Sequence, residues 1–99
     1  MEITLQYFDG CPNWTTVDHR LAELISGRPD LTLRRELVAT AEQAERIGFR
    51  GSPSILVDGI DPFADPNAPV GLECRIYATP AGPAGAPTTD QLREVLGDA

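Results

Sequence analysis

The 99-residue sequence has little positive charge, a single histidine and only two cysteines, and these scarcities exclude several classes of function. Eight Lys and Arg residues are set against fifteen Asp and Glu, so the formal net charge is −7. No basic cluster is present that could neutralise the phosphates of a nucleic acid or an anionic bilayer. We therefore expect neither nucleic acid nor membrane as a partner. The sequence also lacks an apolar run of about 18 residues, the length of a membrane-spanning helix.

Signals for export and for metal binding are lacking as well. The start of the chain, Met1-Glu2-Ile3, has no basic segment followed by an apolar core, so we predict a cytoplasmic location. In that reducing compartment, two cysteines are more often catalytic or metal-binding than a structural disulfide. The acidic residues between positions 60 and 71 do not have the spacing of a calcium-binding loop. We interpret that segment as a solvated loop and expect no bound metal or cofactor.

The apolar pattern that is present predicts one α/β domain spanning residues 1–99. A hydrophobic fraction of 41% is ordinary for a folded chain of this length. Helices separate the first three expected strands, which indicates a right-handed parallel β-α-β unit at the start, whereas the last two strands should be antiparallel. Periodicity predicts strands at 2–8, 31–38, 55–57 and 72–77, helices at 12–26, 41–47 and 89–96, and loops at 60–71 and 78–87.

The most informative stretch is Cys11-Pro12-Asn13-Trp14, where the first strand gives way to the first helix. Proline suits the first position of a helix, which makes Cys11 the expected N-cap. Free backbone N–H groups and the helix dipole would favour a thiolate there and lower the pKa of Cys11. The alternative is that Cys11 is a small residue filling the core.

A second stretch, Gly48 to Ser54, precedes the third strand and places Pro53 at its start. Together with Cys11-Pro12 and the order of elements, it gives the chain a resemblance to the thioredoxin-like superfamily. The resemblance implies a minimal thioredoxin fold, β-α-β-α-β-β-α, with a central four-stranded mixed sheet. It also implies a cis Ser52–Pro53 bond, Pro53 lying against Cys11, a Ser52 backbone free to pair with an extended partner peptide, and Cys11 as the attacking thiolate.

The sequence departs from the dithiol members of that superfamily at Trp14, where they have a second cysteine. The resemblance therefore implies a monothiol mechanism, in which Cys11 forms a mixed disulfide that an external thiol resolves. The implied partner is a disulfide-containing protein or a low-molecular-weight thiol. Trp14, Ser52 and Pro53 are the candidate substrate-binding residues, although Trp14 is equally suited to core packing.

The second cysteine, Cys74, lies in the expected fourth strand, where Leu72, Cys74 and Ile76 alternate with Glu73, Arg75 and Tyr77. The family topology implies that this strand begins far from Cys11, so we expect Cys74 to be a buried hydrophobic residue. A Cys11–Cys74 pair is the less favoured alternative, since the geometry of the loop before it is not readable from sequence.

Two other functions remain open. The widely spaced cysteines are also similar to the pair of the alkylmercury lyases, which would make the protein a handler of soft metals or organomercurials. That chemistry needs a carboxylic acid to protonate the leaving carbon, and Asp9 is the nearest candidate. The remaining possibility is a binding module that has the same fold without redox activity.

Overall fold

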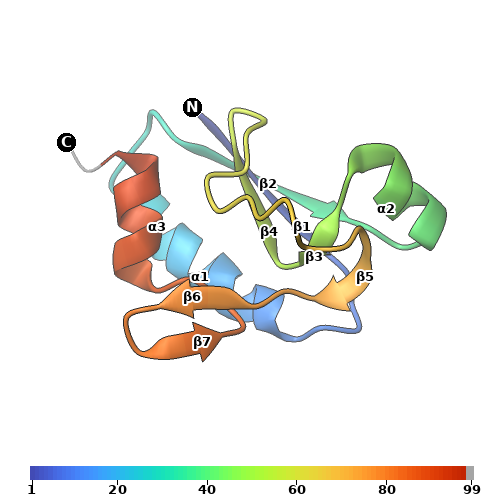
Figure 1. Cartoon of the computed structure of the whole chain (residues 1–99). Helices are drawn as coiled ribbons and strands as arrows, with labels where there is room; N and C mark the ends of the chain where they lie inside the picture. Colours follow the sequence, from blue (N-terminus) through green and yellow to red (C-terminus); the bar gives the residue numbers. More distant parts are fainter. Residues whose placement is uncertain (98–99) are drawn as a thin grey trace.

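A three-stranded mixed sheet lies at the centre of the protein in the computed structural model, which describes residues 1–97 (Figure 1). Its middle strand is β1 (Glu2–Tyr7), in which four successive residues, Ile3 to Gln6, are buried. Strand β2 (Thr32–Leu37) pairs with β1 in parallel, and β4 (Ser54–Val57) pairs with it in the antiparallel direction. The parallel start follows the sequence expectation, since a helix connects β1 to β2.

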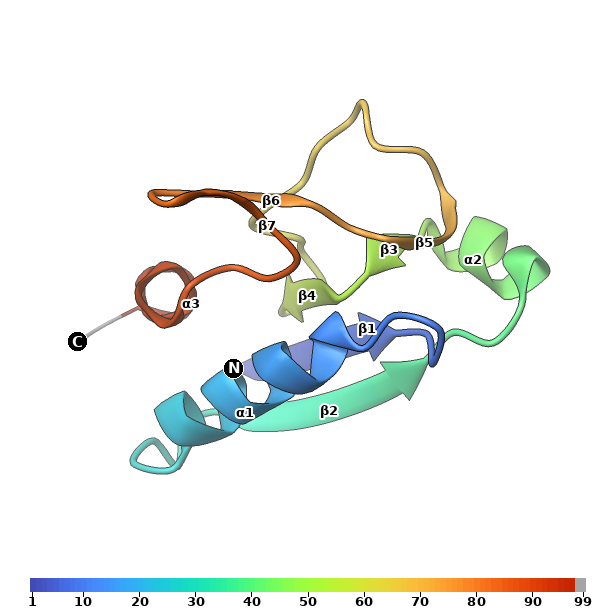
Figure 2. The same cartoon turned by 90° about the horizontal axis from the view of Figure 1, so that it is seen from below.

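Helices α1 (Asn13–Ile25) and α3 (Thr89–Leu96) contact each other, whereas α2 (Ala41–Ile47) lies at the opposite end of the molecule (Figures 1 and 2). The larger hydrophobic core lies between the sheet and helices α1 and α3. Its fully buried members include Ile3, Leu5, Val17, Leu21, Ile55 and Leu92. Within the described residues, no helix combines the length and the apolar character needed to cross a membrane.

The predicted N-terminal caps of α2 and α3 are confirmed by their hydrogen bonds. At α3, the Thr88 hydroxyl accepts a hydrogen bond from the Gln91 backbone N–H, and the Gln91 side chain accepts one from the Thr88 N–H. At α2, the Thr40 hydroxyl accepts from the Gln43 N–H, and Gly48 ends the helix in the left-handed region at φ 70°. Each cap satisfies backbone groups that the helix itself leaves unpaired.

The expectation of a four-stranded central sheet is wrong, because the strands after β4 belong to two small separate sheets. Strand β5 (Gly71–Cys74) pairs with β3 (Arg50–Ser52), and β6 (Tyr77–Thr79) forms a hairpin with β7 (Gly82–Ala84). The predicted strand 72–77 is therefore broken at Arg75. Residues 78–87, predicted as a loop because of their Gly and Pro content, contain most of the hairpin. Gly82, with a φ of 109°, permits the tight turn between β6 and β7.

The expected antiparallel pairing of the last strands is also wrong: β5 runs parallel to β3, with Arg50 opposite Gly71 and Ser52 opposite Cys74. A parallel pair requires a connection of about a dozen residues or more, and the segment from Asp58 to Val70 supplies it. This segment carries the chain back to the beginning of β3, where the Gly71 N–H donates to the Phe49 carbonyl at 3.0 Å. The crossover brings Cys74 to the end of β3 that lies nearest to Cys11.

Candidate functional site

Cys11 and Cys74 form a disulfide, with their Cα atoms 5.7 Å apart and the two residues 63 positions apart in sequence. That Cα separation lies within the ordinary range for a disulfide. The preference for an unpaired Cys74 is therefore wrong, and the less favoured alternative is what the structure contains. The physical reason is the parallel crossover, which reverses the direction assumed for the strand that carries Cys74.

The Ser52 carbonyl group joins the two cysteine-bearing segments. It accepts a hydrogen bond from the Arg75 backbone N–H at 2.9 Å, and the Cys11 Sγ lies 3.5 Å from the same oxygen. The edge of β3 that we expected to be free for a partner peptide is therefore occupied by the chain's own β5. The expectation of a free Ser52 backbone is wrong for this disulfide-bonded form.

Cys11 lies one residue earlier than predicted relative to α1. The N-cap is Pro12, which has helical φ and ψ and makes no side-chain capping bond. Cys11 is fully buried, and the Asn13 Nδ2 donates to its Sγ at 3.8 Å. Gly85 leaves room for the Asn13 amide, because a Cβ at position 85 would overlap the Nδ2 atom. The chain thus positions one amide donor beside the sulfur of Cys11.

The other predicted site residues have different surroundings. The Ser52–Pro53 bond is cis, as predicted, and both residues are buried. The Ser52 hydroxyl accepts from the Phe8 N–H at 3.3 Å, which links this turn to the end of β1. Trp14 stacks on Tyr7 with ring centroids 4.1 Å apart and packs against the larger core. Trp14 therefore contributes to packing, whereas Ser52 belongs directly to the disulfide site.

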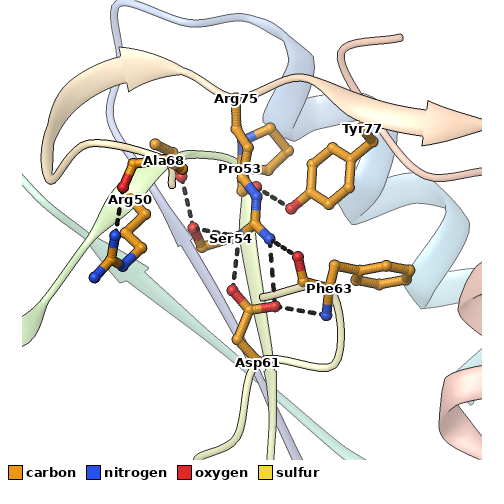
Figure 3. Close-up of polar contacts among 9 residues, drawn as sticks. Arg50, Pro53, Ser54, Asp61, Phe63, Ala68, Arg75 and Tyr77 are labelled. Atoms are coloured by element: carbon orange, nitrogen blue, oxygen red, sulfur yellow. Dashed lines mark hydrogen bonds and ion pairs between the residues drawn. The ribbon is translucent and has the colours of Figure 1, made fainter. Parts of the chain in front are cut away.

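A buried arginine supports the site, and the sequence did not reveal it (Figure 3). The Arg75 side chain is 5% exposed and forms an ion pair with Asp61 at 2.7 Å. Its guanidinium also donates to the Ser54 hydroxyl at 3.3 Å and to the Phe63 carbonyl. Arg75 thereby fixes the segment after β4 against the turn that contains the cis proline.

Tyr77 continues this network toward the turn. Its ring lies 4.7 Å from the Arg75 guanidinium carbon, and its hydroxyl donates to the Pro53 carbonyl (Figure 3). The Phe63 ring packs edge-on against it, with centroids 5.4 Å apart. Burial raises the pKa of the Tyr77 phenol far above its ordinary value, which keeps this hydroxyl protonated as a donor.

The inward and outward faces of residues 74–77 are reversed relative to the expectation from alternation. Arg75 and Tyr77 are buried at 6% and 4% exposure, whereas Ile76 is 68% exposed and Cys74 is also exposed. Cys74 is therefore not the buried hydrophobic residue that we expected. The carboxylate that pairs with Arg75 is Asp61, which lies in the segment predicted to be a solvated loop.

A cleft of about 660 Å³ opens beside the disulfide, between the 62–69 segment and strands β5 and β6. Cys74 lies in its wall. The apolar part of the lining includes Phe63, Ile76 and Pro83, and the charged part includes Arg50 and Glu73. The volume is within the usual range for sites that bind small molecules.

Comparison with known proteins finds no matching family model, no similar curated protein and no similar solved structure.

Proposed function

We propose that this protein carries out thiol–disulfide exchange with Cys11 and Cys74 as its redox couple. The observation that supports the proposal best is the juxtaposition of the two cysteines at one end of β3, with Cα atoms 5.7 Å apart. The sequence suggested a monothiol mechanism, but a second sulfur within bonding distance of the first makes a dithiol couple the better hypothesis. The thioredoxin-like resemblance remains a prediction, and it is consistent with the cis proline and the helix that follows Cys11.

The surroundings of the pair favour reversible exchange. One cysteine is buried beside an amide donor, and the other is exposed at a cleft, so an external thiol can reach the disulfide from one side. The Asn13 amide, whose Nδ2 lies 3.8 Å from the sulfur of Cys11, is placed to stabilise negative charge there once the bond is broken. A cytoplasmic location, predicted from the sequence, would supply such thiols.

The test is equilibration of the folded protein with mixtures of glutathione and glutathione disulfide. We expect a reversible two-electron transition, measured by mass spectrometry after alkylation of free thiols. Cys11→Ser and Cys74→Ser should each lose the internal disulfide and show only a glutathionyl adduct on the remaining cysteine, whereas Ser26→Ala, an exposed substitution at the end of α1, should leave the transition unchanged. A pair that stays oxidised in millimolar glutathione alone for many hours would refute redox exchange as the function.

The same juxtaposition supports soft-metal binding as a second candidate function. Two thiolates this close can bind a soft ion such as Hg²⁺ through both sulfurs. Organomercurial cleavage would further require an acid, and Asp9 lies in the exposed turn before Cys11. Titration of the reduced protein with Hg²⁺ tests this alternative, and tight one-to-one binding that is lost in both single-cysteine variants would favour it.

A further inference from the structure

The two cysteines of the disulfide differ sharply in exposure. Cys11 is fully buried, whereas Cys74 is exposed at the end of an edge strand. Thiol–disulfide exchange proceeds by attack of a thiolate on one particular sulfur, and access helps to decide which sulfur is attacked. The difference in burial therefore helps to decide which of the two cysteines an external thiolate attacks first.

The surroundings of Cys11 close it off from an incoming reagent. The Ser52 carbonyl oxygen lies 3.5 Å from the Cys11 Sγ, and the Asn13 Nδ2 lies 3.8 Å from the same sulfur. Ser52 and Pro53 are themselves buried. Gly85 packs directly against the Asn13 side chain. A reagent could reach the sulfur of Cys11 only by displacing these groups.

Cys74, in contrast, forms part of the wall of the 660 Å³ cleft, and Cys11 does not line it. The cleft offers apolar contact at Ile76 and charged groups at Arg50 and Glu73. A small thiol with charged ends can occupy it with its sulfur next to Cys74. An extended peptide cannot pair along β3 while β5 holds that edge, so the cleft favours a low-molecular-weight thiol over a protein.

We infer that an external low-molecular-weight thiol attacks the sulfur of Cys74 and that Cys11 is the leaving thiolate. In this step the external thiolate forms a disulfide with Cys74, and the electron pair of the broken Cys11–Cys74 bond stays on Cys11. A second external thiolate then attacks the mixed disulfide, releases the external disulfide and leaves Cys74 reduced. The protein gains two electrons, and two external thiols are oxidised to one disulfide.

This inference rests on the proposed function and reverses the role that the sequence predicted for Cys11. In the oxidising direction, the thiolate of Cys74 attacks an external disulfide and Cys11 then resolves the mixed disulfide. The arrangement suits the chemistry, because a thiolate that is stabilised by a nearby amide donor is a good leaving group.

The direct test uses the oxidised wild-type protein with glutathione, quenched with acid at short times. Peptide mapping by mass spectrometry should find the glutathionyl adduct on Cys74 in at least tenfold excess over Cys11. As a second measurement, the free thiol of Cys11→Ser should react with glutathione disulfide at least tenfold faster than that of Cys74→Ser. An adduct mainly on Cys11, together with normal equilibration, would overturn this assignment and leave the proposed function standing. No adduct on either cysteine and no reduction would overturn both.

The role of the cleft as the entry route of the external thiol is tested by substitutions that narrow it. Ala78 lines the cleft, whereas Ala81 lies in the turn of the same hairpin and does not. Ala78→Trp should slow the reduction of the disulfide by glutathione at least fivefold, and Ala81→Trp should not change it. Equal rates in the two variants would refute the cleft as the route by which the thiol arrives.

Discussion

Ser52 and Cys74 lie opposite each other in the parallel ladder of β3 and β5, so the exposed cysteine belongs to the strand that covers the cis-proline turn. The disulfide and this ladder therefore depend on each other. Other supports of β5 include the Gly71 and Arg75 backbone hydrogen bonds, the side-chain network of Arg75 and the packing of Leu72 against a small apolar cluster that contains Phe49. Each of these supports can be weakened separately, by reduction, by substitution or by a change of pH.

Reduction of the disulfide should lower the free energy of unfolding and loosen β5. Closure of a loop of 63 residues corresponds to about 4 kcal/mol in the chain-entropy model. Urea unfolding with and without dithiothreitol measures this difference, and the Cys11→Ser/Cys74→Ser double variant should not respond to the reductant. On reduction, hydrogen exchange at the Gly71 and Arg75 amides should accelerate more than at the β1 amides, which should accelerate only as far as the lower global stability requires. Unchanged exchange at β5 would contradict the dependence of the ladder on the disulfide.

Gly51 should tolerate no side chain. Its φ is 110°, and a Cβ there would lie 3.0 Å from the Arg75 Cβ and 3.1 Å from the Glu73 carbonyl oxygen. Backbone strain and crowding together should make Gly51→Ala about 2–4 kcal/mol less stable in denaturant unfolding.

Alanine substitutions at two other glycines distinguish the contribution of backbone strain from that of crowding. Gly59 has a φ of 84°, and a Cβ added there would have no atom within 4 Å, so Gly59→Ala should cost only the backbone strain of about 1–2 kcal/mol. Gly27 has neither constraint, and Gly27→Ala should stay within about 0.5 kcal/mol of the wild type. Equal losses at positions 51 and 59 would show that crowding between β3 and β5 contributes nothing.

The ion pair of Asp61 and Arg75 should matter far more than an exposed one. The two side chains are 21% and 5% exposed, and Asp61→Asn would leave a buried guanidinium without its counter-charge. We expect a loss of about 3 kcal/mol, because a charge buried without its partner is strongly destabilising.

The matched control is Asp90→Asn in the Arg93–Asp90 pair, whose side chains are 43% and 90% exposed. That change should cost less than about 0.5 kcal/mol in the same unfolding measurement. If the two substitutions had similar effects, the buried network would not be what fixes the 60–63 segment against the turn.

Stability should fall at alkaline pH because of Tyr77. Burial raises the pKa of its phenol in the folded state, so the unfolded chain releases that proton first. The contribution of Tyr77 to stability is therefore complete below the unfolded pKa of about 10, and it is lost as pH rises through the folded value. Unfolding of the oxidised protein at pH 9 to 11 measures the decline. Tyr77→Phe should be less stable at pH 8 and should lose most of that decline; an unchanged decline would assign it to another group.

The sequence contained enough local information to predict the caps of α2 and α3, and the family resemblance implied the cis proline. Thr88 and Gln91 are three residues apart, and a capping box needs nothing beyond that spacing. Ser52–Pro53 was recognised because the resemblance depends on a short contiguous motif. The caps depend only on a few neighbouring residues.

The cysteine pair could not be predicted in the same way, because it depends on the direction in which the chain returns after β4. The segment up to Gly71 could have led to an antiparallel or a parallel strand, and only its packing decides between them. The alternating pattern wrongly predicted the inward and outward faces around Arg75 for a related reason. An arginine is placed inside only when a carboxylate such as Asp61 meets it there, and that contact spans 14 residues.

The separation of 63 residues between the cysteines has a consequence for assembly of the protein. In a denatured chain the two thiols seldom encounter each other, whereas the native fold holds them together at a high effective concentration. Oxidation of the pair and folding are therefore thermodynamically linked, and whatever stabilises the native packing also makes the bond harder to reduce. The redox state of these two sulfurs would then report on the conformational integrity of nearly the entire polypeptide.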